Sequence, residues 1–550
     1  YVKKDDERVE LRFDGIYMDS IIYINGVEVW QWKYGYSAFD IDITSFLIEG
    51  QNEITVRVNY QAPNSRWYSG AGIYRDVWMK VTHKAYIPWD GIYVNAEKKE
   101  KNIWSLNIET ELKTDRPVRL EYMLADKKAR TNFRILGESY AWPNKELQKI
   151  QFESIVKEPD IWDVTNPVCY ELIVRLFEEA EAYELQEERL TYGFRTFSFE
   201  PDNGFLLNGR KLKINGVCEH HDLGCLGSAY HSDAMRRKLG KLKDMGANGI
   251  RFAHNMSAEN AVELADEMGF VVISEAFDMW ERSKTEFDYA RFFEDWYKKD
   301  IASWIRRDRN HPSIIMWSIG NEIYDTQASE RGQEITRMLA DEVRKHDPKK
   351  LAPITICSNY MGGENAQRCA DILKLTGYNY SERLYRQHHE AYPDWIIFGS
   401  ETASTVQSRG IYHFPYRQTC LADEDQQCSS LGNSVTSWGA KSTEACIIAE
   451  RDCQFSCGQF IWTGFDYIGE PTPYHTKNSY FGQIDTAGFP KDSFYLYQSE
   501  WKKKDKNPMV HLFPYWDFNE GQLIDVRACT NAAAVELFVN DRSYGIVPID

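Results

Sequence analysis

The fold is decided by the stretch Arg307-Asp308-Arg309-Asn310-His311-Pro312-Ser313-Ile314-Ile315-Met316-Trp317-Ser318-Ile319-Gly320-Asn321-Glu322. A helix is expected to end before Pro312, because proline cannot continue it and biases the preceding residue toward extended backbone. The run from Ser313 to Ile319 is apolar and β-branched without alternation, which predicts a strand buried on both faces, as in a parallel sheet. Glu322 follows at the carboxyl end, where α/β barrels keep their chemistry. A glutamate here could equally cap a helix or pair with an arginine, so the rest of the chain must decide.

Composition narrows the class of protein. A chain of 550 residues predicts about three or four domains. Aromatic residues make up 14%, with 17 Trp and 33 Tyr, and their flat faces suit sugar rings, although all-β domains also use many. The net charge of -18 excludes a nucleic-acid partner, since phosphate binding needs a basic surface. No run approaches the roughly 18 apolar residues that span a bilayer, so no membrane association is expected.

The two ends and the cysteines give further expectations. No signal peptide is visible, and the chain opens at Tyr1 within strand-like sequence, so we expect that an earlier part of the first domain is absent. The 11 cysteines are scattered, and Cys453 and Cys457 are four apart on a predicted helix. Without a CxxC pair they predict free thiols in a reducing, cytoplasmic (bacterial) setting, with no metal site and no cofactor.

Periodicity divides the chain into four parts. Residues 1–82 alternate over 8–13, 21–30 and 53–59 around an Asn25-Gly26 turn and predict a β-sandwich. Residues 83–197 predict a second β-domain, with strands near 104–112, 118–124 and 170–176. Residues 198–506 alternate strands and helices. Residues 507–550 predict the beginning of a C-terminal β-sandwich, with strands at 523–528 and 535–539.

The third part predicts a (β/α)8 barrel. Its strands are expected at 212–217, 249–253, 270–274, 314–319, 352–356, 372–378, 395–399 and 459–463. Helices are expected at 234–245, 258–268, 289–307, 331–346, 366–371, 383–392 and 442–455. This alternation fits a barrel of ordinary size. An open doubly wound sheet is the alternative, but no glycine-rich phosphate loop follows any strand.

Polar side chains follow every predicted strand. In chain order they are Glu219-His220-His221-Asp222, Arg251 with His254-Asn255, Glu275 with Asp278, Asn321-Glu322, Asn359-Tyr360, Asn379-Tyr380, Glu401, and Trp462 with Asp466. A barrel brings all of them to one face, so they are expected to converge on one cavity.

Two glutamates are best placed for chemistry at that cavity. Glu322 closes the fourth predicted strand and Glu401 the seventh. Two carboxylates across an aromatic pocket predict glycoside hydrolysis, with one as nucleophile and the other as acid and then base. No Ser-His-Asp motif, GxSxG elbow or HExxH motif competes.

Several motifs together resemble glycoside hydrolase family 2, the β-galactosidase and β-glucuronidase family. They are Gly70-Ala71-Gly72-Ile73-Tyr74-Arg75-Asp76, Asn215-Gly216-Val217 with Cys218 to Asp222, Gly246-Ala247-Asn248-Gly249-Ile250-Arg251-Phe252-Ala253-His254, the block from Arg307 to Glu322, and Ser400-Glu401. The resemblance covers nearly the whole chain. It implies a jelly-roll-like sandwich, an immunoglobulin-like domain, a catalytic TIM barrel and a retaining, exo-acting β-glycosidase.

The resemblance also implies roles. Glu322 is the acid/base, Glu401 the nucleophile, and Asn321 holds the sugar 2-hydroxyl. The substrate-binding residues that it implies are His254, Tyr380 (with Tyr378 close enough to compete) and Trp462, to which we add His221, Asp222, Asp278 and Asp466.

The sugar is the open question. The segment from Gly469 to Gly482 resembles the bacterial β-galactosidase branch. The glucuronidase branch carries Asn-x-Lys to bind the uronate, and here His475-Thr476-Lys477 offers only the lysine. A β-galactosidase is therefore expected, with a β-glucuronidase or β-galacturonidase as the alternative. A carbohydrate-binding protein without catalysis is disfavoured by the presence of both glutamates. A homo-oligomer is expected.

Overall fold

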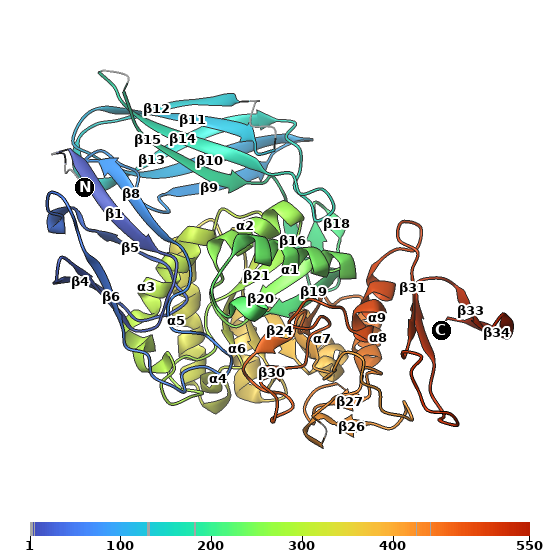
Figure 1. Ribbon diagram of the computed structural model, residues 1–550. Helices are drawn as coiled ribbons and strands as arrows, with labels where there is room; N and C mark the ends of the chain where they lie inside the picture. The colour runs from blue at the N-terminus through green and yellow to red at the C-terminus, as the bar shows by residue number, and fades with distance from the viewer. Residues whose placement is uncertain are drawn as a thin grey trace.

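The structure is a computed structural model that describes residues 4, 6–128, 133–180, 183–424, 426–440 and 442–549. At its centre lies a closed parallel barrel of eight strands (Figure 1). The strands are β19 (Ile214–Glu219), β20 (Gly249–Phe252), β21 (Val271–Glu275), β22 (Ile314–Asn321), β23 (Ile354–Ser358), β24 (Leu375–Asn379), β25 (Ile396–Ala403) and β28 (Gly458–Trp462). All eight fall where the sequence predicts them, so the barrel is confirmed and the open sheet is excluded.

Helices cover the outside of the barrel. They are α1 (Ser232–Met245), α2 (Glu259–Met268), α3 (Ala290–Asp308), α4 (Tyr324–Ala328), α5 (Arg331–His346), α6 (Glu364–Leu373), α7 (Tyr385–Ala391), α8 (Thr443–Asp452) and α9 (Asp492–Trp501). The sequence analysis missed the short α4, and also α9, which is rich in aromatic residues of middling helix propensity. The prediction that Cys453 and Cys457 lie on a helix is wrong, because α8 ends at Asp452.

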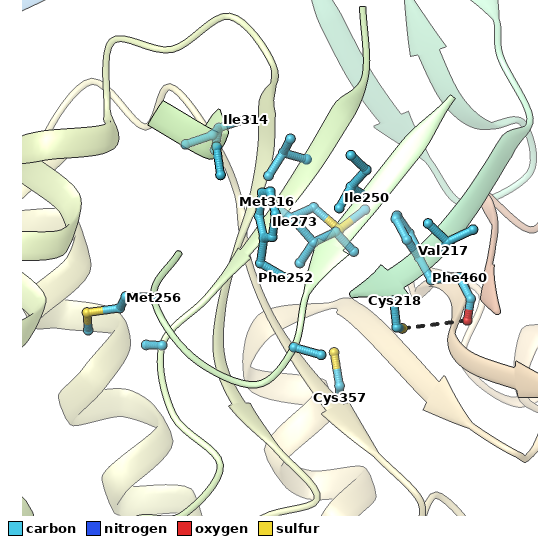
Figure 2. Packing of buried hydrophobic residues seen from close by; sticks show 14 of the residues in the cluster. Val217, Cys218, Ile250, Phe252, Met256, Ile273, Ile314, Met316, Cys357 and Phe460 are labelled. Atoms are coloured by element: carbon cyan, nitrogen blue, oxygen red, sulfur yellow. Dashed lines mark hydrogen bonds between the residues drawn. The ribbon is translucent and has the colours of Figure 1, made fainter. Parts of the chain in front are cut away.

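The barrel interior explains the glycine after Asn215. The strands β19 to β22 bury apolar side chains such as Val217, Ile250, Ile273 and Met316, which belong to the core of the barrel domain (Figure 2). A Cβ atom on Gly216 would lie 2.3 Å from Cδ1 of Phe460 on β28, so only glycine fits there. Every residue of β22 is buried, as its unbroken apolar run predicts.

The N-terminal domain is a β-sandwich of two three-stranded sheets. One has the order β5-β1-β8 and the other β4-β3-β6. Their bounds are β1 (Glu7–Phe13), β3 (Ser20–Ile24), β4 (Val27–Trp32), β5 (Phe39–Asp42), β6 (Ile54–Val58) and β8 (Val77–His83), with β2 (Ile16–Tyr17) and β7 (Gly72–Ile73) paired beside them. Between β6 and β7 the chain carries Arg66 and Trp67 toward the barrel.

The second domain is also a sandwich and lies at the top of Figure 1. Its sheets have the orders β13-β10-β9 and β12-β11-β14-β15. The strands are β9 (Ile92–Lys98), β10 (Ile103–Thr114), β11 (Val118–Asp126), β12 (Arg134–Ala141), β13 (Asn144–Lys157), β14 (Tyr170–Glu178) and β15 (Tyr183–Tyr192). Buried Trp104 and Tyr122 lie in the core between them. A small sheet of β16 (Phe197–Glu200), β17 (Gly204–Leu207) and β18 (Arg210–Lys211) leads into the barrel.

The C-terminal part forms two strand pairs, of which the first lies beside α9 and the second lies farther from the barrel (Figure 1). They are β31 (Val510–Phe513) with β32 (Arg527–Thr530), and β33 (Ala534–Val539) with β34 (Arg542–Pro548). The predicted strand at 523–528 is misplaced, because Leu523 is 91% exposed and pairing begins only at Arg527. Two further short pairs lie in barrel loops, namely β26 (Cys420–Leu421) with β27 (Ser434–Val435) and β29 (Tyr467–Ile468) with β30 (Asn478–Ser479). None of the helices within the described ranges has the length and apolarity to cross a bilayer.

Candidate active site

A pocket of about 460 Å³ opens at the carboxyl ends of the barrel strands. Glu322 and Glu401 both line it, as the convergence of strand ends predicts. Its other lining residues are Arg66, His254, Asn359, Asn379, Tyr380, Ser381, Arg383, Trp438, Trp462, Glu470, Thr472 and Phe481. They come from the N-terminal sandwich as well as from the barrel, so the site is shared by two domains.

The backbone is strained where two of these side chains enter the pocket. Glu322 is the first residue after β22 and has φ +47°, and Tyr380 is the first after β24 with φ +51°. A side chain in the left-handed region costs about 1–3 kcal/mol and persists only where its surroundings hold it. Here each strand end turns sharply and presents its last side chain to the pocket.

Glu401 on β25 is surrounded by hydrogen-bond donors. Arg251 Nη1 donates to Oε1 at 2.8 Å, and the Tyr380 hydroxyl donates to Oε2 at 2.6 Å. His254 Nε2 lies 3.4 Å from the same carboxylate. Tyr378 instead directs its hydroxyl to His388 Nδ1 at 2.9 Å, away from Glu401. Of the two competing tyrosines, only Tyr380 therefore contacts Glu401.

Arg251 is fully buried and connects several strand ends. Its Nη2 donates to Glu275 Oε2 at 2.8 Å and to Asn321 Oδ1 at 2.9 Å. Burying a guanidinium is unfavourable unless carboxylates compensate it, and here Glu275 and Glu401 do so on either side. This network fixes the position of Glu401 beneath the pocket.

Glu322 is held from the neighbouring strand. Asn379 Nδ2 donates to Glu322 Oε1 at 2.9 Å and to Asn321 Oδ1 at 3.0 Å. Arg66 Nη1 lies 3.9 Å from Glu322 Oε2. Glu322 therefore receives fewer and longer contacts from donors than Glu401 does.

The charge of Glu322 affects the pKa of Glu401. Burial and the charge of Glu322 raise the pKa of Glu401 to about 8, against the opposing effects of Arg251 and Tyr380. Two carboxylates that share a site cannot both ionise easily. Burial and the nearby Glu322 therefore disfavour the ionised form of Glu401, while Arg251 and Tyr380 favour it.

His254 and Trp462 form one wall of the pocket. Their rings stack with centroids 5.1 Å apart and an interplanar angle of 4°. Burial lowers the pKa of His254 well below its usual value, so the imidazole is neutral. Glu275 Oε1 lies 2.8 Å from His254 Nδ1 and fixes the ring orientation. A flat apolar surface of this kind suits the face of a sugar ring.

A charged cluster joins the sandwich to the barrel. Arg66 Nη2 donates to Asp278 Oδ1 at 2.9 Å, and its Nη1 lies 3.4 Å from Glu470 Oε1. Lys284 Nζ also donates to Asp278 at 2.8 Å. Although burial opposes ionisation, the nearby charges of Arg66 and Lys284 lower the pKa of Asp278 to about 2. Asp278 thus anchors Arg66 at the edge of the pocket.

Six of the residues predicted from sequence lie outside the pocket lining. His221 faces a separate small cavity beside Tyr36 and Tyr74. Asp222 is buried near Lys238, whose ammonium donates to its backbone carbonyl. Asp466 accepts from Lys491 Nζ at 2.7 Å, and Lys477 is exposed. Asn321 and Asp278 lie just behind the lining and contact it through Asn379 and Arg66.

Other pocket residues were missed. Arg251, Glu275 and Asn379 stand among the polar strand ends but were given no role. Arg66 and Glu470 lie in loops that sequence periodicity cannot place. The sequence features that could have pointed to them are the run Ser65-Arg66-Trp67 and the position of Glu470 just after β29.

No group of three or more His, Cys, Asp or Glu side chains within the described ranges is arranged to hold a metal ion. Several charged residues of the site are instead paired with one another, as the contacts of Arg66 and Arg251 illustrate. The chemistry of this site is that of two carboxylates beside an aromatic wall.

Comparisons with known proteins agree with this geometry. Residues 201–508 match "Glycosyl hydrolases family 2, TIM barrel domain", and residues 2–83 match "Glycosyl hydrolases family 2, sugar binding domain". Residues 521–550 match a domain of unknown function, DUF4982.

Individual relatives are also β-glycosidases by name. The β-galactosidase BoGH2A of Bacteroides ovatus is 39% identical over 98% of this chain and 68% of its own. A β-glucuronidase of Bacteroides fragilis is 27% identical over 98% of this chain and 79% of its own. The crystal structure of a β-glycosidase from Bacteroides vulgatus superposes with a TM-score of 0.88 at 32% identity, over 99% of this chain and 71% of its own. The chain therefore belongs to glycoside hydrolase family 2 and is a β-glycosidase.

Proposed function

We propose that the protein removes terminal β-galactosyl residues by a retaining mechanism. The observation that carries this proposal is that Glu322 and Glu401 line one pocket together with aromatic side chains. A retaining reaction needs two carboxyl groups with different roles.

Glu401 is the proposed nucleophile and Glu322 the acid/base. Arg251 and Tyr380 donate directly to Glu401 and favour its ionised form, which a nucleophile requires. Glu401 attacks the anomeric carbon while Glu322 protonates the departing oxygen. Ionised Glu322 then takes a proton from water, which releases the sugar from Glu401.

The surrounding residues receive matching roles. Asn321 is proposed to bind the 2-hydroxyl, since its amide is held by Arg251 and Asn379. The stacked pair of His254 and Trp462 is proposed as the platform for the sugar ring. His221, Asp222 and Asp466, which lie outside the lining, are proposed to support the loops around the pocket instead of contacting sugar.

A neutral sugar is favoured over a uronate. Lys477, the residue proposed to recognise a uronate, is exposed and absent from the pocket lining. Glu470 lies in the lining and adds a third carboxylate beside Glu322 and Glu401, which would repel the carboxylate of a uronic acid. Carboxylates accept hydrogen bonds from hydroxyls well, as a galactoside requires. The β-galactosidase of Bacteroides ovatus also has a higher identity than the β-glucuronidase of Bacteroides fragilis.

A β-glucuronidase or β-galacturonidase is the second candidate. Arg383 lines the pocket, is exposed, and forms no ion pair with any described residue, its Nη1 donating only to the Tyr380 carbonyl at 3.1 Å. A free guanidinium at the rim could accept a carboxylate in a bidentate manner.

The deciding experiment compares kcat/KM on matched p-nitrophenyl β-galactoside, β-glucuronide and β-galacturonide. A galactoside preference of at least about 100-fold, equivalent to about 2.7 kcal/mol, is expected. If a uronide is preferred, Arg383→Ala should abolish that preference, and the galactosidase assignment is then wrong.

A reducing, cytoplasmic location and a homo-oligomer are also proposed. None of the eleven cysteines is placed in a disulfide bond, which is typical of proteins in reducing compartments. Light scattering of the purified protein tests the oligomer, and cell fractionation tests the location.

A further inference from the structure

A second, larger cavity lies at the opposite end of the barrel from the active site. Its volume is about 840 Å³. One wall comes from β9 and from the segment after β15 in the second sandwich. The other comes from the amino ends of barrel strands, including Ile354 of β23 and Ile396 of β25. The catalytic residues occupy the carboxyl ends, so the barrel itself separates the two sites.

The lining of this cavity is basic in a chain whose net charge is -18. Its cationic residues are Lys98, Arg195, Arg309, Arg344, Lys349 and Lys350. We call it the interdomain basic cavity. His311 also lines it and is held by Asp266 Oδ2 at 2.6 Å, which raises its pKa to about 9 despite burial.

The two carboxylates of the lining, Glu97 and Asp347, make their short contacts with other groups. Glu97 accepts from Lys99 Nζ at 2.8 Å, and Lys99 lies outside the lining. Asp347 is 2% exposed and accepts from the Tyr93 hydroxyl at 2.7 Å and from Trp317 Nε1 at 3.2 Å. Among the described residues, no carboxylate lies within ion-pair distance of Lys98, Lys349 or Lys350.

Two guanidinium groups of the lining, Arg195 and Arg309, are bound by backbone carbonyls and not by a carboxylate of the described residues. Arg195 donates to the carbonyls of Pro312 and Ile314, the latter at 2.6 Å from Nη2. Arg309 donates to the His346 carbonyl at 2.8 Å, and its buried Nε has no partner in the described part of the chain. Burial lowers the pKa of Arg195 to about 10 and also lowers the pKa of Arg309.

A structural role alone leaves this arrangement costly. Buried cations without carboxylate partners are unfavourable, and carbonyl contacts compensate them only in part. The exposed lysines on the rim add repulsion to the same space. An anionic ligand would compensate both the guanidinium groups and the rim lysines. Ligand sites of about 300–1,000 Å³ occur preferentially at domain interfaces.

We propose that the interdomain basic cavity binds a small molecule that carries two or more phosphate groups. Guanidinium groups recognise phosphate oxygens through paired N–H donors, and lysines add point charges around them. Arg195 and Arg309 would hold one phosphate at the floor, and Lys349 and Lys350 a second at the rim. Binding there would brace the second sandwich against the barrel and so stabilise the folded enzyme.

The test is isothermal titration calorimetry of the full chain with inorganic pyrophosphate, at low ionic strength. The double variant Lys349→Glu/Lys350→Glu removes the rim charges. The matched control Lys503→Glu/Lys504→Glu reverses two adjacent exposed lysines after α9, which changes the net charge equally. Both variants should keep wild-type glycosidase activity, which verifies their folding.

Saturable binding of pyrophosphate is expected, weakened at least tenfold by the rim variant and unchanged by the control. Arg195→Gln should weaken it as well, with an unaltered circular dichroism spectrum. A nucleoside diphosphate that binds more tightly than pyrophosphate would identify an organic ligand, whereas equal affinity would identify the inorganic ion. No saturable binding, equal loss in both double variants, or binding of an acidic polysaccharide but not of pyrophosphate would overturn the proposal.

Discussion

Replacing Tyr380 by Phe isolates one hydrogen bond to the proposed nucleophile. The hydroxyl donates to Glu401 Oε2 at 2.6 Å, and this bond favours the ionised carboxylate. A hydrogen bond to a charged group contributes about 1.5–3 kcal/mol. Since about 1.36 kcal/mol corresponds to one pH unit, the already raised pKa of Glu401 should rise further by about one to two pH units.

The consequence is visible in the pH dependence of kcat/KM. The wild-type profile should be bell-shaped, because Glu401 must be ionised while Glu322 keeps its proton. A raised pKa for Glu401 means that ionisation requires a higher pH, so the acid limb moves upward. At a pH below the acid limbs of both enzymes, kcat/KM of Tyr380→Phe should be about 10- to 100-fold lower than that of the wild type. The difference should become smaller as the pH rises.

Tyr378→Phe is the matched control. It deletes the hydroxyl of a tyrosine two residues earlier, on β24, but that group bonds His388. Its acid limb should stay in place even if its stability falls. Equal shifts in the two variants, or no shift in Tyr380→Phe with chemistry rate-limiting, would refute the role given to Tyr380.

Three further outcomes test the assignments. With an activated aryl glycoside, azide should rescue Glu322→Ala to give a β-linked azide and should give an α-linked azide with Glu401→Ala, and exchanged anomers would reverse the two roles. A crystal structure should place the two carboxyl groups about 5–5.5 Å apart, whereas about 6.5–9.5 Å would indicate inversion. Lys477→Ala should leave kcat/KM unchanged on both galactosides and glucuronides, because the side chain is exposed outside the pocket, and a selective loss on glucuronides would show that it reaches the sugar.

The barrel was predictable because local patterns report its strands directly. Buried parallel strands give unbroken apolar runs such as the one in β22, and each ends at a recognisable polar group. Because a closed parallel barrel brings the carboxyl ends of all its strands to one face, Glu322 and Glu401 could be placed at one cavity. The loops and the C-terminal part lack such periodicity, which is why the strand at 523–528 was misplaced and α9 was missed.

Side-chain contacts within the site were less predictable. The sequence predicts that a polar residue at a strand end reaches the rim of the barrel. It does not predict which neighbouring side chain that residue will bond. Asp466 thus looked like a sugar ligand and instead accepts from Lys491, while Arg251 looked unremarkable and instead holds Glu401. These choices depend on distances across the barrel that no sequence spacing encodes.

Arg66 shows why the catalytic barrel needs the sandwich in front of it. Asp278 and Glu470 lie on loops after different barrel strands, and the guanidinium of Arg66 lies between them. Without that cation, Asp278 would keep only Lys284 as a charged partner, and Glu470 would face Glu322 without compensation. Two negative charges close together in a buried site are unfavourable. The sandwich therefore contributes a charge that allows the barrel to hold several carboxylates around one sugar.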